Sequence, residues 1–148
     1  MDKHPNIIEA GDGIRALLTI SRTIAVLGIK TEAQANQPAY YVPEYLQSAG
    51  YEIVPVPVYF PETTEILGHS VYRKLVDIPG EVDLVNVFRR PEDIAQHLDD
   101  ILAKKPRAVW FQHGIRNDAA AQTIADAGIQ VVQDRCIMVD HRALMREA

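Results

Sequence analysis

The chain has 148 residues, of which 47% are hydrophobic and 24% are charged, and its formal net charge is −5. This length suits one domain over residues 1–148, and the composition is typical of a folded globular protein. The acidic balance does not favour non-specific binding to nucleic acid, so we expect no nucleic-acid partner. No run approaches the ~18 apolar residues of a membrane span, and Met1–Pro5 does not begin a signal peptide. We therefore expect a cytoplasmic protein without membrane contact.

The first elements are a helix and a buried strand. Residues 12–20 place their apolar side chains on one helical face behind Asp12, which is a possible N-cap. Residues 23–27 form a short run rich in β-branched side chains without polar alternation, which is typical of a strand buried on both faces. The run ends at Gly28, where a missing side chain would let a ligand approach the backbone.

A second helix and a second strand follow. The helix starts near Pro38, carries apolar residues at helical spacing, and ends before Gly50, which suits its C′ position. Residues 51–58 are predicted to form the second strand. Because two prolines lie near its end, we expect regular pairing to stop near Val56.

The middle of the chain is less regular. Residues 60–79 show no sustained periodicity and are expected to contain a small turn and a short helical piece. Residues 82–88 read as a third buried strand. Residues 90–93 then open a helix, with proline near its first position and acids in its first turn.

The last part returns to regular alternation. Residues 108–111 are predicted to form the fourth strand, and Asn117 can cap a helix that Gly128 ends. Residues 129–132 are predicted to form the fifth strand, and a final helix follows Cys136. This alternation predicts a three-layer α/β, Rossmann-like domain with a five-stranded, mainly parallel sheet in the order 3-2-1-4-5.

Basic side chains gather at the predicted strand ends. Ligands of open α/β sheets bind at the carboxyl ends of strands, beside the reversal of strand order, which this order places between strands one and four. Four of the five ends carry a cation, namely Lys30, Arg89 with Arg90, Arg116 and Arg135. A cation near a helix N-terminus opposes the helix dipole by ~0.3–1 kcal/mol, and a polyphosphate would reverse that sign. We therefore favour an anion site, the alternative being that each cation pairs with a nearby acid or faces solvent.

Two common nucleotide motifs are missing. A dinucleotide fingerprint needs G-x-G-x-x-G after the first strand and an acid roughly 20 positions later. The first turn has only Gly28, and the second strand ends in proline and valine. The sequence also contains no G-x-x-x-x-G-K-[ST] phosphate loop.

Four stretches carry a more specific resemblance. They are Ile24–Gly28, Val87–Asp93, Trp110–Asn117 and Val132–Arg142, which include F-R-R, Q-x-G-x-x-N and D-R-C at successive strand ends. Together they resemble the small, single-domain CoA-binding proteins, which are similar to the N-terminal domain of the succinyl-CoA synthetase α subunit. The resemblance runs from about residue 15 to the C-terminus and implies CoA or an acyl-CoA as the small-molecule ligand.

The resemblance also implies a role for each strand end. The loop Gly28, Ile29 and Lys30 would hold the CoA phosphates with the following helix start, although Glu32 supplies an acid there. The end of strand two would lie against the nucleotide, the ends of strands three and four would line the pantetheine path, and the end of strand five would close the far side. The residues at these four ends are Pro55 and Val56, then Val87, Phe88, Arg89 and Arg90, then Gln112, His113, Gly114 and Asn117, and finally Asp134, Arg135 and Cys136.

Cys136 is the only cysteine, which excludes an internal disulfide and a multi-cysteine zinc site. Beside Arg135 and before a helix its thiolate would be stabilised and could meet the CoA thiol, whereas a small buried residue is the alternative. No histidine has metal-ligand spacing, so we expect no metal. We expect a CoA-binding module without catalytic residues that could form homo-oligomers. The alternatives are a nucleotide-dependent oxidoreductase of unusual fingerprint, an acyl-transfer enzyme using Cys136, or an interaction subunit that has lost the ligand.

Overall fold

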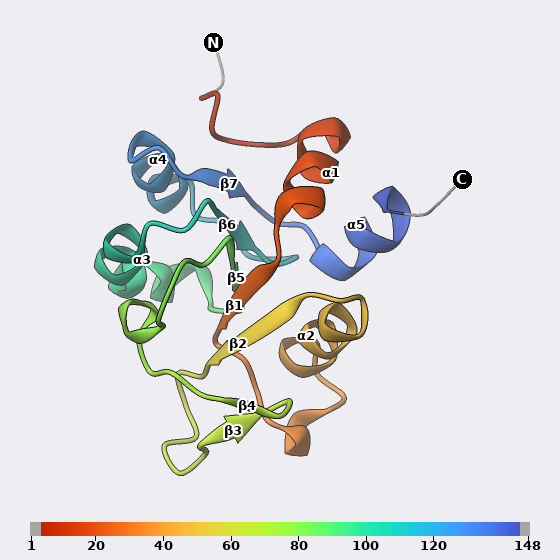
Figure 1. The fold of residues 1–148 in the computed structure, drawn as a ribbon. Coiled ribbons are helices and arrows are strands. Elements are labelled where there is room, and N and C mark those ends of the chain that lie inside the picture. Colours follow the sequence, from red (N-terminus) through yellow and green to blue (C-terminus); the bar gives the residue numbers. More distant parts are fainter. Residues whose placement is uncertain (1–3, 146–148) are drawn as a thin grey trace.

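A five-stranded parallel sheet forms the centre of the computed structural model, which describes residues 4–145 (Figure 1). Its strands, in chain order, are β1 (Thr23–Leu27), β2 (Glu52–Val56), β5 (Leu84–Val87), β6 (Ala108–Phe111) and β7 (Gln130–Val132). Every ladder is parallel and most strand residues are buried, as a sheet covered on both faces requires. The expected α/β class is therefore confirmed. Residues 1–3 of the stretch judged not to be a signal peptide lie outside the described residues.

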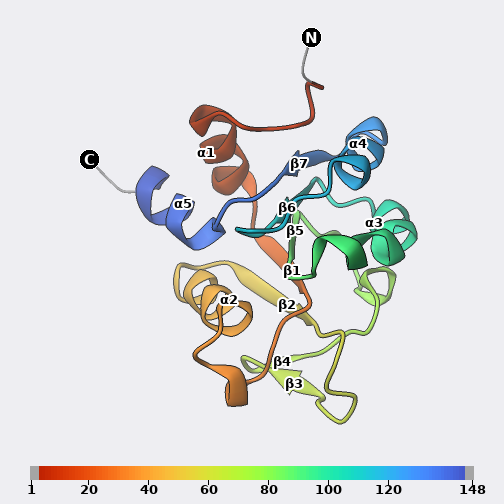
Figure 2. The same cartoon turned by 180° about the vertical axis from the view of Figure 1, so that it is seen from behind.

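Helices cover both faces of the sheet and complete three layers (Figures 1 and 2). One face packs against α1 (Gly11–Ile20), α2 (Pro38–Ser48) and α5 (Ile137–Leu144), and the other against α3 (Leu98–Lys104) and α4 (Asp118–Asp126). Each face has its own apolar core, with Trp110 fully buried on the first and Phe111 on the second. Within residues 4–145, no helix is both long enough and apolar enough to span a bilayer.

Short elements make up the less regular connections. They are the 3₁₀ turns η1 (Glu32–Gln34), η2 (Leu75–Asp77) and η3 (Pro91–His97), and a hairpin of β3 (Glu65–Ile66) and β4 (His69–Ser70). The hairpin lies beside β2 in both views, and the backbone N–H of Tyr72 donates to the Pro55 carbonyl at 3.0 Å (Figures 1 and 2). The hairpin segment therefore covers the outer edge of the sheet.

The strand order corrects one expectation. The observed order is β2-β1-β5-β6-β7, which is 2-1-3-4-5 in the numbering of the five predicted strands, so 3-2-1-4-5 was wrong. The backbone N–H of Glu52 donates to the Arg22 carbonyl, and the Val56 carbonyl accepts from the Gly28 N–H. The backbone polar groups of these β2 residues therefore point toward β1. Pro55 alternates with them, so its backbone points to the outer edge of the sheet. Because proline has no N–H, a further strand at that edge would lack a ladder bond. The reversal of strand order consequently lies between β1 and β5.

The helix ends agree with the sequence in most places. Asn117 is the N-cap of α4, and its Oδ1 accepts from the Ala120 N–H at 3.0 Å, as predicted. Gly50 and Gly128 follow α2 and α4 with positive φ angles of 106° and 86°. The N-cap of α1 is Ala10 and not Asp12, which lies in the first turn. There the Asp12 carboxylate still complements the helix dipole.

Candidate functional site

The carboxyl ends of β1 and β5 meet tightly at Gly28. This glycine has φ +89°, and an added Cβ would lie 2.4 Å from the Phe88 carbonyl oxygen and 3.2 Å from Arg89 Cδ. The Phe88 N–H donates to the Leu27 carbonyl at 2.9 Å, which holds the two strand ends together. The absent side chain at Gly28 therefore first permits close packing of the chain segment that carries Arg89.

A cavity of about 340 Å³ lies at these strand ends. Its polar lining includes the predicted cations Lys30, Arg89 and Arg90, which come from the ends of β1 and β5. The other lining residues are Gln37, Pro38, Ala39, Phe88, Pro91 and Ile115. The lining surface is mostly apolar and its charged residues are all cationic, which suits an anionic ligand that also carries an apolar segment.

The start of α2 forms one wall of the cavity. Gln37 is the N-cap and Pro38 the first residue of this helix, so the positive end of its dipole lies at the cavity. The Lys30 ammonium donates to Gln37 Oε1, and the Lys30 N–H donates to the Ala39 carbonyl at 3.1 Å. These contacts tie the loop after β1 to the helix that follows it.

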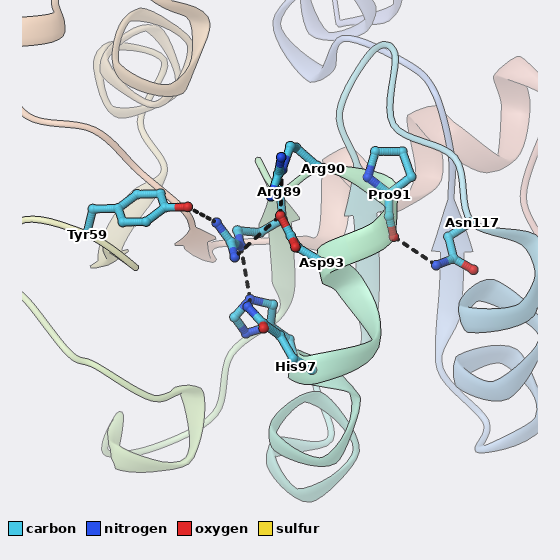
Figure 3. A network of polar contacts seen from close by, with 8 residues as sticks. Tyr59, Arg89, Arg90, Pro91, Asp93, His97 and Asn117 are labelled. Carbon is cyan, nitrogen blue, oxygen red and sulfur yellow. Dashed lines mark hydrogen bonds and ion pairs between the residues drawn. The ribbon is translucent and has the colours of Figure 1, made fainter.

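Arg89 is the most enclosed cation of the site, with 8% of its surface exposed. Its Nε donates to His97 Nε2 at 3.1 Å and its Nη1 to the Tyr59 hydroxyl at 3.3 Å, as Figure 3 shows. The guanidinium carbon also lies 5.5 Å from the centre of the Tyr59 ring, in cation–π geometry. Nη2 lies 3.8 Å from Asp93 Oδ2, which is close enough for attraction but too long for a hydrogen bond.

The Asp93 carboxylate interacts with two arginines. The exposed Arg90 donates from Nε to Asp93 Oδ2 at 2.7 Å, and Arg89 faces the same carboxylate (Figure 3). The Arg90 hydrogen bond, opposed by some desolvation, lowers the pKa of Asp93 below its usual value. Every charged residue that lines the cavity is a cation, namely Lys30, Arg89 and Arg90, so the lining itself carries a surplus of positive charge.

Asn117 does not line the cavity but links two segments next to it. Its Oδ1 caps α4, while its Nδ2 donates to the Pro91 carbonyl at 3.0 Å (Figure 3). Its N–H donates to Gln133 Oε1 at 2.8 Å. The side chain therefore links α4 to the start of η3, which follows Arg90.

The cations at the ends of β6 and β7 are paired away from the cavity. Arg116 Nε lies 3.1 Å from Asp118 Oδ1. Arg135 makes a two-pronged contact with Asp140, at 2.6 and 2.8 Å, and this hydrogen bonding raises the Arg135 pKa. The alternative that strand-end cations pair with nearby acids is thus realised at these two ends, and also for Arg90, which pairs with Asp93.

The remaining polar residues at these ends hold the loops together. Asp134 has a positive φ of 54°, and its Oδ1 accepts from the Gly114 N–H at 2.6 Å and lies 3.6 Å from His113 Nδ1. The buried Gln112 accepts through Oε1 from Asn86 Nδ2 and from the Ile137 N–H, both at 3.3 Å. Gln112 therefore joins β5 and β6 to the first turn of α5.

Several other predicted site residues lie outside the cavity. Ile29, Val56 and Val87 are buried in the core, and Cys136 is the half-buried N-cap of α5. Pro55 lines a different hollow, of about 440 Å³, along the outer edge of β2. Of the sequence-assigned residues, the cavity gathers Lys30, Phe88, Arg89 and Arg90.

Sequence reasoning included the start of the helix after the first strand without naming its residues, and it missed Ile115 and the supports of Arg89. Gln37, Pro38 and Ile115 line the cavity, and Tyr59 and His97 contact Arg89. The start of α2 had a signal, because its proline follows the first strand and its polar loop. Tyr59 had none, because it lies 30 residues before Arg89 and only the tertiary fold brings it there. His97 lies 8 residues after Arg89, and it is the course of η3 that turns it back toward the guanidinium.

Comparison with known proteins decides the family. Residues 22–142 match the family described as "CoA binding domain". The chain belongs to this CoA-binding domain family. The match includes the ends of all five strands of the large sheet, and with them the whole cavity.

Relatives of this family member span almost its whole length. "Uncharacterized protein YneT" from Bacillus subtilis (strain 168) is 35% identical over 128 residues, covering 86% of this chain and 91% of the relative. The structure of cell-free ID.343 from Thermus thermophilus is 39% identical with a TM-score of 0.84, covering 92% of this chain and 99% of that one. A hypothetical protein from Pyrococcus horikoshii OT3 is 28% identical with a TM-score of 0.84, covering 99% of both chains.

Proposed function

We propose that this chain binds CoA or an acyl-CoA at the carboxyl ends of β1 and β5 and has no catalytic activity of its own. The observation that carries the proposal is the convergence of Lys30, Arg89 and Arg90 on one cavity in a member of the CoA-binding domain family. CoA carries a diphosphate and a further phosphate, which cations and a helix N-terminus stabilise. The start of α2 supplies that helix end.

The cavity fits part of such a ligand. At about 340 Å³ it is near the lower end of the range of roughly 300–1,000 Å³ usual for ligand sites. Its cationic rim suits phosphate, and Phe88, Pro91 and Ile115 offer apolar surface. The rest of the ligand would extend along the sheet edge toward His113 and Gly114, which the family resemblance assigns to the pantetheine path.

The proposal gives Cys136 no catalytic role. The thiol packs against the apolar core beneath α1, α2 and α5, and within residues 4–145 no hydrogen bond links it to a base. A nucleophilic cysteine is normally activated by such a neighbour. The His141 ring instead lies against Tyr45, with Nδ1 2.7 Å from the hydroxyl.

Calorimetric titration with four compounds tests the proposal. CoA should bind, and pantetheine, which lacks the nucleotide phosphates, should bind much more weakly because the cations contribute nothing to it. Binding of NAD in place of CoA would favour the oxidoreductase alternative. Failure to bind CoA, NAD and ATP would favour an interaction subunit and overturn the proposal.

A further inference from the structure

His97 has an unusual hydrogen-bonding position behind Arg89. Two donor nitrogens approach the same ring atom, His97 Nε2: Arg89 Nε at 3.1 Å and the Gln96 amide nitrogen at 3.3 Å. A ring nitrogen that receives donated hydrogen bonds carries a lone pair and no proton. The arrangement therefore requires a neutral His97 whose proton is on Nδ1.

His97 reaches the candidate site only through Arg89. It does not line the 340 Å³ cavity but a separate hollow of about 450 Å³, whereas Arg89 lines the cavity. His97 also comes from the end of η3, while Arg89 follows β5 (Figure 3). Removing the imidazole would therefore affect a ligand in the cavity by changing Arg89.

We propose that His97 is a positioning residue whose neutral Nε2 holds the Arg89 guanidinium in the orientation that faces the anion cavity. A guanidinium is planar, so a fixed direction for its Nε–H also fixes the directions of all its Nη–H groups. Tyr59 contributes a second contact from the other side, through Nη1. This inference rests on the proposed binding of a phosphate-bearing ligand, and it adds a dependence on the proton of His97.

The surroundings of His97 favour its neutral form. Burial and the Arg89 charge lower its pKa below the ordinary value of 6.5, although the carboxylates of Asp100 and Asp93 oppose this. The charged and titratable groups that face it or share its hollow come from the segment before η2, the loop after β5, η3 and α3: Arg73, Lys74, Arg89, Asp93, Asp99 and Asp100. Protonation would remove the acceptor and place a cation beside Arg89.

Acidification should therefore weaken the binding of the ligand. The Arg89 Nε is 3.1 Å from His97 Nε2, whereas a phosphate in the cavity would lie on the far side of the guanidinium. Coulomb energies fall with distance, so repulsion between the two cations outweighs attraction between His97 and the phosphate. In the free protein Arg89 can turn away from a protonated His97, but in the complex its contact with the ligand prevents this.

Two substitutions separate positioning from general damage. His97→Gln keeps a side-chain acceptor that cannot be protonated, and His97→Leu removes the acceptor. His69→Gln is the matched control, because His69 lies on β4, outside the cavity. Calorimetric titration of each protein with CoA at pH 7.5 should show the Gln variant within about threefold of wild type and the Leu variant weaker by about tenfold or more.

Between pH 7.5 and pH 5.5, wild type and the His69 control should lose about fivefold more affinity than His97→Gln. Protonation of the CoA phosphates is common to all proteins and cancels in this comparison. Wild-type affinity in the folded Leu variant, or an equal loss in the Gln variant, would overturn the inference.

Nitrogen NMR of the ligand-free protein tests the contact without CoA. At pH 7.5 the His97 ring should be protonated at Nδ1 and not at Nε2, and His97→Leu should shift the Arg89 Nε–H signal. A proton on Nε2 would overturn the inference whatever the ligand does. A wild-type protein that shows this tautomer but does not bind CoA would instead overturn the proposed function.

Discussion

Replacing Arg89 by alanine is the most direct test of the anion site. Arg89 is almost enclosed, and its Nη2 makes no hydrogen bond within the described range 4–145. A phosphate could therefore accept from Nη2 without breaking the contacts of Nε with His97 or of Nη1 with Tyr59. One hydrogen bond to a charged group contributes about 1.5–3 kcal/mol.

This free energy converts to a measurable loss of affinity. Since each 1.4 kcal/mol is a factor of ten, Arg89→Ala should raise the Kd for CoA by roughly 10- to 150-fold. Binding of pantetheine, which has no phosphate, should change much less. Isothermal titration at low and moderate salt measures both, and the loss for CoA should shrink as salt screens the site.

Arg116→Ala is the matched control for Arg89→Ala. Arg116 is also a strand-end arginine, but it is exposed, pairs with Asp118 and does not line the cavity. Its removal should leave the Kd for CoA unchanged. The reasoning is refuted if Arg89→Ala binds CoA like wild type while its circular dichroism spectrum stays native, or if the two alanine variants lose the same affinity.

Three further predictions concern stability, each measured by urea unfolding. Gly28→Ala should cost about 2–5 kcal/mol, from ~1–2 for its positive φ and ~1–3 for overlap with the Phe88 carbonyl, whereas Gly128→Ala, with φ +86° and open space, should cost only ~1–2. Equal losses would show that the contact at β5 does not matter. Asn117→Ala should cost ~1–3 kcal/mol because it loses the α4 cap and the Pro91 contact, while Asn117→Asp keeps the cap and should retain most of the stability; a larger loss in the aspartate variant would contradict this. Burial lowers the His141 pKa in the folded protein, so the unfolded chain binds the proton more readily and the unfolding free energy should fall as the pH drops through 6.5. His141→Gln should flatten that fall and His69→Gln should not; a wild-type slope in His141→Gln would refute the assignment.

Local patterns in the chain predicted most of the elements. Each strand of the large sheet lies in a short, mostly apolar run, because a strand covered on both faces buries most of its side chains. Asn117 and Gly128 marked the ends of α4 through chemistry that operates within one helical turn. These features depend on neighbours in the sequence, so they are visible in it.

The strand order depended on a longer-range fact. The sequence shows a proline at position 55, but not which edge of β2 it faces. The fold turns Pro55 outward and places β5 beside β1, so that Gly28 lies against Phe88 and Arg89. The reversal of strand order, and with it the cavity, therefore lies between β1 and β5, and not between the first and fourth strands as expected from the sequence.

The sequence alone determined that the strand ends carry basic groups, because that depends only on residue identity and on the periods that define the elements. It did not determine which of those groups share a space. The tertiary structure brings Lys30, Arg89 and Arg90 to one cavity, and it pairs Arg116 and Arg135 with the carboxylates of Asp118 and Asp140. The support of Arg89 by Tyr59 and His97 also exists only in the fold, because hydrogen bonds require contact, and these residues lie 30 positions before Arg89 and 8 positions after it.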